Sequence, residues 1–197
     1  MAADETFICN QALGLLGSSK IMSLDDESKE ARFCVRFYEQ TRDEVIAGHR
    51  WNFAIQRAEL SRLAEAPVSE WEYHYQLPSD CLRVLQLNGF DEMENASRFV
   101  IEGRKLLTDD DRAVIRYLWG VTDVTLYPPL FIEALAVRLA SKLAHPLTGS
   151  RSMPQELHQE YLRVTGPKAR RTDAFEGQPK TKPAWVTSPL VRSRFGG

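Results

Sequence analysis

The sequence lacks the features that mark several classes of protein. Its 197 residues carry a formal net charge of only −2, so it has no large basic excess of the kind that dedicated nucleic-acid binders use. The longest apolar stretch, residues 130–143, is interrupted by Glu133, Arg138 and Lys142, which excludes a membrane span there. The first residues lack the basic and then apolar pattern of a secretory signal. We therefore expect a protein that is made and kept in the cytosol.

Motifs of catalysis and metal binding are also missing. The sequence has no phosphate-binding or dinucleotide-binding glycine motif, no serine-nucleophile motif and no histidine pair with the spacing of a helical zinc site. The acidic run Asp109 to Asp111 fits a solvated turn better than a cation site. The acids of residues 25–30 fit a helix start better than paired catalytic carboxylates. We predict no enzyme activity, no cofactor and no metal.

Cysteines are few, and the overall composition is ordinary. Cys9, Cys34 and Cys81 are far apart in the sequence and each lies among apolar residues, which favours reduced, buried thiols over disulfides. Hydrophobic residues make up 43% and charged residues 26% of the chain. These values and the length indicate one globular domain with room for a sizeable subdomain, but not two full domains.

The most informative stretch runs from Ser23 to Phe53. Apolar residues recur in it at three- and four-residue intervals: Ala31, Cys34, Val35, Tyr38, Thr41, Val45 and Ile46. This spacing predicts one long amphipathic helix, with Ser23 and Asp25 as capping candidates and Gly48 as its stop. Phe33 and Phe37 fall on the opposite side of the same helix. Either this second face packs under the sheet that follows, or it contacts a neighbouring subunit.

Three further helices are predicted. The first is capped by Asp4 or Thr6 and has a buried stripe of Ile8, Ala12, Leu15 and Leu16. Another follows Pro128 and Pro129, is apolar over most of its circumference, and is ended by Pro146. The last starts at Ser152, carries Leu157, Tyr161, Leu162 and Val164, and is kinked or interrupted at Gly166 and Pro167.

Residues 51–125 alternate between apolar and polar, as strands do. Strands are predicted at 71–77, 82–87 and 113–119, with a hairpin about Gly103 within 99–107. The strands at 71–77 and 82–87 are expected to pair across the turn at residues 78–80. Together the strands would form one small antiparallel sheet.

These elements predict an α+β fold that is mainly α, an antiparallel four-helix bundle with an inserted small antiparallel β-sheet subdomain and an extended C-terminal tail. Residues 1–50 would supply the first two helices, and 51–125 the β subdomain. Residues 126–174 would supply the last two helices, and 175–197 the tail.

The tail is rich in proline and glycine and has neither a helical period nor a core of its own. Its isolated apolar anchors predict that a partner holds it; they are Trp185, Leu190, Val191 and Phe195. The C-terminal part of the chain is also basic, through Lys168, Arg170, Arg171, Lys180, Lys182, Arg192 and Arg194. These charges either keep a helix end and a tail in solution or dock on an acidic protein surface or on passing DNA.

Several motifs occur together in an order that resembles one family. They are N-Q-A-L-G-L-L-G at 10–17, S-L-D-D at 23–26, G-H-R-W-N-F at 48–53, Y-Q-L-P-S-D-C-L-R at 75–83 and F-I-E-A-L-A-V-R-L-A-S-K-L-A at 131–144. The chain thereby resembles the tail tubular protein A, or head-to-tail adaptor, family of tailed bacteriophages and prophages. The resemblance covers most of the chain and is weakest over residues 91–111, and Gly166-Pro167 departs from it.

The resemblance implies a structural virion protein of the neck, assembled in the cytoplasm of the bacterial host. It implies a ring, typically of twelve copies, that docks beneath the portal, carries a tail or nozzle protein, and passes double-stranded DNA without sequence specificity. No membrane and no catalytic residue is implied. The subunit or portal interface is predicted at Phe33, Phe37, Lys168, Arg170, Arg171, Trp185, Leu190, Val191, Arg192, Arg194 and Phe195.

Two other functions remain open. A tail enzyme could hydrolyse cell-wall polymer in a pocket between bundle and sheet, and two facing carboxylates of raised pKa would support it. A monomeric adaptor module could bind one partner through its tail, and a single-copy mass in solution would support that function.

Overall fold

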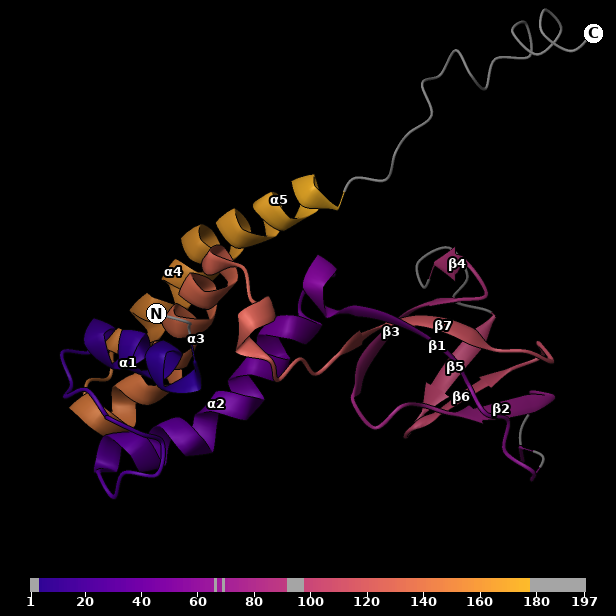
Figure 1. Cartoon of the computed structure of the whole chain (residues 1–197), viewed down its shortest axis with the longest axis horizontal. Helices are drawn as coiled ribbons and strands as arrows, with labels where there is room; N and C mark the ends of the chain where they lie inside the picture. The colour runs from indigo at the N-terminus through magenta and orange to yellow at the C-terminus, as the bar shows by residue number, and fades with distance from the viewer. Residues whose placement is uncertain (1–3, 66, 69, 92–97, 178–197) are drawn as a thin grey trace, which may run out of the picture.

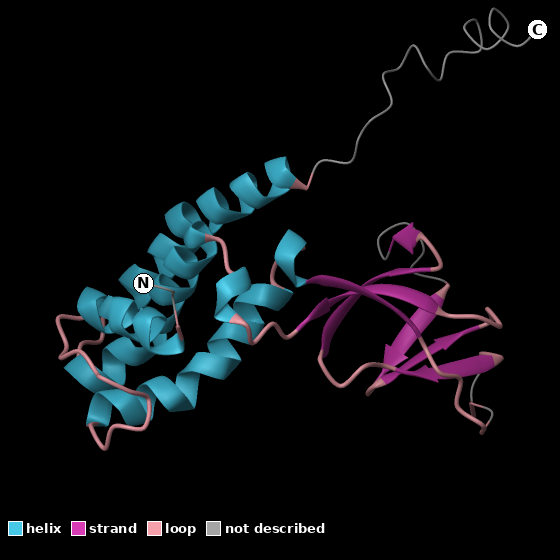
Figure 2. Ribbon diagram, viewed as in Figure 1, coloured by secondary structure: helices cyan, strands magenta, loops and turns pink. Residues whose placement is uncertain are grey.

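A computed structural model describes residues 4–65, 67–68, 70–91 and 98–177 of the chain. Figure 1 shows two parts: the helices from both ends of the chain gather in one, and the strands between them form the other. Figure 2 shows the same division by secondary structure. The helices are α1 (Glu5–Leu15), α2 (Lys29–Ala47), α3 (Pro129–Thr148), α4 (Met153–Glu160) and α5 (Gly166–Glu176). Short helical turns are η1 (Asn52–Ala54), η2 (Val124–Leu126) and the π-helical η3 (Tyr161–Thr165).

The helix α3 is the centre of the helical part. Its buried residues lie around most of its circumference and include Phe131, Leu135, Leu139 and Leu143. The helices α1, α2 and α4 all pack against it. Because apolar residues cover nearly the whole wheel, burying α3 requires neighbours on several sides.

The predicted four-helix bundle is wrong. In a bundle, each helix contacts its neighbours around one shared core. Here α1 and α2 pack mainly on α3 rather than on each other, and the predicted fourth helix consists of α4, η3 and α5. The small residues Ala134, Ala136, Ala140 and Ala144 allow close approach to α3 from different sides, which favours helices around a central one.

The helix α2 begins later than the sequence predicted. Its N-cap is Ser28, whose hydroxyl accepts a hydrogen bond from the Ala31 amide, and not Ser23 or Asp25. The earlier acids form their own turn, since a carboxylate oxygen of Asp26 accepts the Met22 amide at 2.8 Å. The stop at Gly48 is confirmed.

Two residues of the predicted stripes lie in solvent instead. In α2, Val35 is 56% exposed, and the neighbouring buried stripe includes Arg42. In α1, which is capped by Asp4 as predicted, Leu15 is 47% exposed and Leu13 is buried in its place. Both errors arise because a spacing rule finds a face of the helix but not the limits of the surface that covers it.

The prediction for the end of α3 was also incomplete. The helix continues through Pro146 to Thr148 and ends at Gly149, whose φ of 74° is the left-handed conformation that glycine adopts readily. A proline so close to the C-terminal end of a helix removes one hydrogen bond without ending the helix.

The strands form two antiparallel sheets rather than the predicted single sheet. They are β1 (Ile55–Glu59), β2 (Tyr73–Gln76), β3 (Cys81–Leu87), β4 (Phe90–Asp91), β5 (Phe99–Glu102), β6 (Lys105–Thr108) and β7 (Val114–Trp119). The first sheet has the order β1-β7-β3-β4 and the second β2-β6-β5. The predicted pairing of β2 with β3 is therefore wrong, because residues 78–80 carry the chain from one sheet to the other. The hairpin at Gly103, with φ of 58°, is confirmed.

The first sheet contributes to two cores. One is the β core, which includes Tyr75 and Leu106 from the second sheet and Val84, Ile115 and Tyr117 from the first. The other is the helical core, which Leu85 and Leu118 join from β3 and β7. Alternate residues of β3 and β7 thus attach the strand-rich part to the helices.

The π-helical turn η3 carries the chain past Gly166 and Pro167. The predicted interruption is confirmed: the α-helical pattern stops between α4 and α5, where η3 is π-helical and the Gly166 amide is bonded to the Tyr161 carbonyl oxygen. Proline has no amide hydrogen to donate and its ring crowds the carbonyl one turn earlier, and the wider turn accommodates both. A Cβ atom added to Gly166 would lie 2.6 Å from the Tyr161 carbonyl oxygen, so only glycine fits.

We predict that Gly166→Ala destabilises the fold by about 1–3 kcal/mol, because the added methyl group overlaps a backbone atom. The matched control is Gly14→Ala in α1, where no atom lies within 4 Å of the added Cβ. That variant should be neutral or stabilised by roughly 0.5–1 kcal/mol. Chemical denaturation followed by circular dichroism measures both, and equal effects of the two substitutions would contradict the steric account.

Candidate functional site

The exposed side of α2 carries an aromatic pair between cations. The rings of Phe33 and Phe37 stack with centroids 6.3 Å apart and an interplanar angle of 9°. The ammonium of Lys29 lies 5.9 Å from the centroid of the Phe33 ring. Arg32 and Arg36 line a surface hollow with Lys29 and Phe33. We call these five residues the α2 face; they share one side of the helix because they are spaced three or four apart.

The position of Phe33 and Phe37 contradicts the interpretation that this second face of α2 packs under the sheet. Both rings are half-buried and pack against the edge of the helical core, not under a sheet. Their remaining surface is exposed in the single chain. Contact with a neighbouring subunit stays a prediction.

The predicted basic residues of α5 lie apart from the α2 face. Figure 1 shows α5 and the first half of α2 on different sides of α3. The ammonium of Lys168 is 3.1 Å from a carboxylate oxygen of Glu133, and the Arg171 guanidinium lies 5.8 Å from the Phe175 ring centroid. Arg170 is half-buried beside Gly166. The predicted interface residues therefore belong to separate surfaces, and Trp185, Leu190, Val191, Arg192, Arg194 and Phe195 lie outside the described residues.

The motif G-H-R-W-N-F holds α5 in place, which the sequence did not reveal. Asp173 of α5 is buried, and its carboxylate accepts the Asn52 amide at 2.9 Å and lies 3.2 Å from Nε2 of His49. The side-chain amide of Asn52 donates to the Asp173 carbonyl oxygen at 2.5 Å. Trp51 is buried between these residues and its indole donates to the Val45 carbonyl oxygen at 2.9 Å. Few side chains of α5 are buried, so this polar anchor adds to the contacts that α5 makes with α3 and η3.

A small pocket of about 140 Å³ lies beneath α5. Its walls are mostly apolar and include Trp51, Leu130 and Phe131, with the carboxyl groups of Asp173 and Glu176 among the lining residues. The carboxylate of Asp173 is already engaged by Asn52 and His49. The Asp173 carboxylate therefore holds α5 against residues 49–52.

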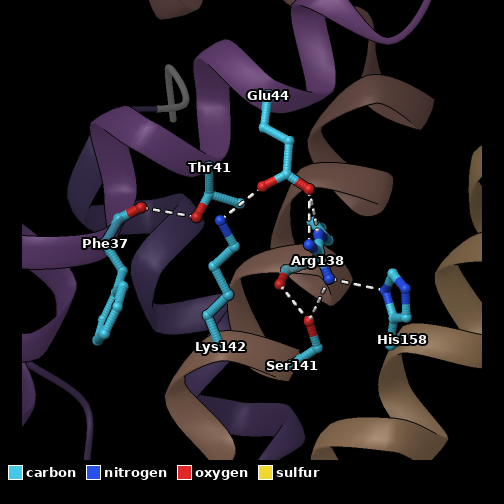
Figure 3. Close-up of polar contacts among 7 residues, drawn as sticks. All are labelled: Phe37, Thr41, Glu44, Arg138, Ser141, Lys142 and His158. Atoms are coloured by element: carbon cyan, nitrogen blue, oxygen red, sulfur yellow. Dashed lines mark hydrogen bonds and ion pairs between the residues drawn. The ribbon is translucent and has the colours of Figure 1, made fainter.

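A second polar cluster joins α2, α3 and α4, as Figure 3 shows. The carboxylate of Glu44 accepts hydrogen bonds from Arg138 and Lys142, both at 2.6 Å. Arg138 also reaches Nδ1 of His158 at 2.7 Å. A guanidinium can only donate, so that imidazole nitrogen accepts and carries no proton. Burial would raise the pKa of Glu44, but the hydrogen bonds and charges of Lys142 and Arg138 outweigh it and lower the pKa.

The three cysteines are buried free thiols, as predicted. Burial raises the pKa of Cys81 to about 11. A hydrogen bond to Cys34, together with burial, raises the pKa of Cys9. Among the described residues, no group of three His, Cys, Asp or Glu side chains is arranged to hold a metal ion.

No model of a known protein family matches the sequence, and no curated protein matches it either. Of the helices that the structure describes, none has the length and apolar composition needed to cross a bilayer. The resemblance to head-to-tail adaptors therefore depends on the motifs of the sequence alone.

We predict that Glu44→Gln lowers stability near neutral pH by roughly 0.2–1 kcal/mol, the range of partly exposed ion pairs. The folded-state pKa of Glu44 lies below its ordinary value of 4.5, so its contribution is complete above 4.5 and is lost as pH falls through the folded-state value. The melting temperatures of wild type and variant should converge in acid. Glu27→Gln, at an exposed position, is the control, and a gap that stays constant with pH would contradict the assignment.

We predict that Asp173→Ala loosens α5 and costs about 1–3 kcal/mol, because it leaves the Asn52 amide and a half-buried imidazole without their acceptor. Hydrogen exchange of the α5 amides should accelerate while that of α3 amides changes little. Glu176→Ala, an exposed change on the same helix, should leave exchange unaltered. Unchanged exchange in both variants would mean that apolar packing, not Asp173, holds α5.

Proposed function

We propose that this protein is a subunit of a head-to-tail adaptor ring, which docks beneath a phage portal, joins it to the tail and lines the DNA passage. The observation that carries the proposal is the α2 face. Its three cations are exposed and its two stacked rings are half-buried, although the opposite side of α2 already packs in the helical core. An apolar and charged surface of this kind suits contact with another protein chain.

The motif on which the resemblance depends also has a structural role that fits an adaptor. Residues 48–53 end α2, lead into the strand-rich part, and hold α5 through Asn52. The same six residues thus set the position of the helix from which the basic, proline-rich C-terminal segment continues. In an adaptor, this segment would contact the portal or an adjacent subunit.

The charge of the chain is compatible with a DNA passage. DNA that must slide should not be held by many phosphate contacts, because each such contact adds to its affinity. A net charge of −2 avoids a strongly basic inner wall. The proposed copy number of twelve comes from the family resemblance.

The test of this function is the assembly state of the full chain, alone and with the portal protein encoded in the same genome. Native mass spectrometry and electron microscopy should find closed rings and rings attached to portals. A single-copy mass in both conditions would contradict the proposal and favour a monomeric adaptor module. Release of soluble fragments from purified peptidoglycan would instead favour the cell-wall enzyme.

We predict that a chain ending at Gly177 folds normally but no longer joins the portal. Gly177 keeps the hydrogen bond from its amide to the Asp173 carbonyl oxygen, so α5 stays capped. The removed segment contains Trp185, Leu190 and Phe195, each worth about 1.5–3 kcal/mol if buried on a partner. Melting temperature checks the fold, and portal binding is measured by sedimentation. Portal binding of undiminished affinity by the truncated chain would show that another surface makes the attachment.

A further inference from the structure

The α2 face has a charge pattern that no acidic side chain neutralises within the described part of the chain. Lys29, Arg32 and Arg36 have no ion-pair partner among the described residues. Arg32 and Arg36 are one turn apart on the helix, and like charges at this spacing destabilise a helix by roughly 0.2–0.5 kcal/mol. Covering the neighbouring phenylalanine rings with a purely apolar surface would also remove water from these cations, which is costly. The matching surface must therefore carry carboxylates beside apolar side chains.

A surface of that kind exists on α4 and η3 of the same protein. Glu156 and Glu160 are exposed, one turn apart, and also without an ion-pair partner among the described residues. The apolar side chains that follow, Leu162 and Val164, are 44% and 57% exposed. Of the two, only Val164 is four residues from Glu160 and so lies on its side of the helix; we call Glu156, Glu160 and Val164 the α4 face. Its carboxylates repel each other as Arg32 and Arg36 do.

The spacing of the charges on the two faces is the same. Four residues of helix advance about 6 Å, so the guanidinium groups at 32 and 36 repeat with the period of the carboxylates at 156 and 160. Beside the charged pair lie the two phenylalanine rings on one helix and Val164 on the other. Two helices laid side by side can therefore bring both charge pairs and both apolar groups into contact at once.

The two faces cannot meet within one chain. Both α2 and α4 pack against α3, which lies between them in Figure 1. Two different surfaces that fit each other produce a head-to-tail contact between copies, and such contacts form a ring when the rotation from copy to copy closes on itself.

We propose that the α2 face of one copy docks on the α4 face of the next copy, which forms the contact between neighbouring subunits. This inference is based on the proposed ring and names the surfaces that build it. Arg32 and Arg36 pair with Glu156 and Glu160 of the next copy. Phe33 and Phe37 cover Val164.

The test reverses the charge of each face in the full-length chain. One variant combines Arg32→Glu with Arg36→Glu, and the other combines Glu156→Arg with Glu160→Arg. Each variant alone puts like charges against each other and should lose assembly, with association at least ten-fold weaker than wild type. A mixture of the two variants should assemble, because every contact between unlike copies again joins opposite charges. The control combines Lys20→Glu with Lys105→Glu at exposed positions outside both faces and should assemble normally.

Light scattering and native mass spectrometry, alone and on portal rings, measure assembly. Assembly of the mixture also shows that both variants are folded. If rings form from either variant alone, or if the folded variants fail to assemble when mixed, the inference is overturned while the adaptor ring stands. If wild type itself forms no ring in either condition, the proposed function has failed.

A nucleic acid is the other partner that cations and stacked rings would suit. Binding of a short mixed-sequence DNA duplex or single strand is therefore measured by fluorescence anisotropy with the same variants. DNA binding that is lost with Arg32→Glu and Arg36→Glu, together with unchanged ring assembly, would overturn the proposed contact. No difference in DNA binding between wild type and that variant supports it.

Discussion

Most of the fold depends on one constraint, that α3 is apolar on nearly every side. Such a helix must be covered all round, and no single neighbour can do so. Its alanines keep the helix narrow, so α1, α2 and α4 each approach closely from different directions. Because the apolar residues of those helices pack against α3, few of them contact another of the three helices. The arrangement around a central helix follows from that distribution of side chains.

The helical part and the strand-rich part are joined at a short segment, residues 48–53. Trp51 lies at the junction, in edge contact with Phe131 of α3 at 5.0 Å between ring centroids. Next to it Asn52 binds α5, and three residues later β1 begins. Since Leu85 and Leu118 of the first sheet are buried in the helical core, the junction is supported by packing as well as by hydrogen bonds. A change in residues 48–53 would thus affect α2, α5 and the first sheet together.

The sequence predicted those features that depend on neighbouring residues in the chain. The Asp4 cap, the Gly48 stop, the hairpin at Gly103 and the largely buried α3 all arise from local geometry and spacing. The sequence-based prediction failed where the pairing of a strand depends on a segment far away in the chain. Nothing within residues 71–87 reveals that β2 pairs with β6.

The candidate interface shows the same limit. Spacing placed Phe33 and Phe37 on a second face of α2, but only the structure shows that they lie at the edge of the helical core with the rest of their surface exposed. The polar anchor at Asp173 lies about 120 residues from its partners His49 and Asn52 in the chain. A pattern of neighbouring residues, such as apolar–polar alternation or a heptad repeat, cannot predict a hydrogen bond between residues so far apart in the sequence.

The charges on the two proposed faces also bear on how copies can be arranged. If two copies met through the same α2 face, three cations would oppose three cations, and two α4 faces would likewise oppose carboxylates. Like charges brought together and partly desolvated cost several kcal/mol, so twofold pairing through either face is disfavoured. Only the unlike pairing relieves the repulsion that each helix already carries between residues one turn apart. Because head-to-tail pairing leaves one α2 face unpaired at one end of an open assembly and one α4 face at the other, the distribution of charge along two helices favours a closed ring over a twofold dimer.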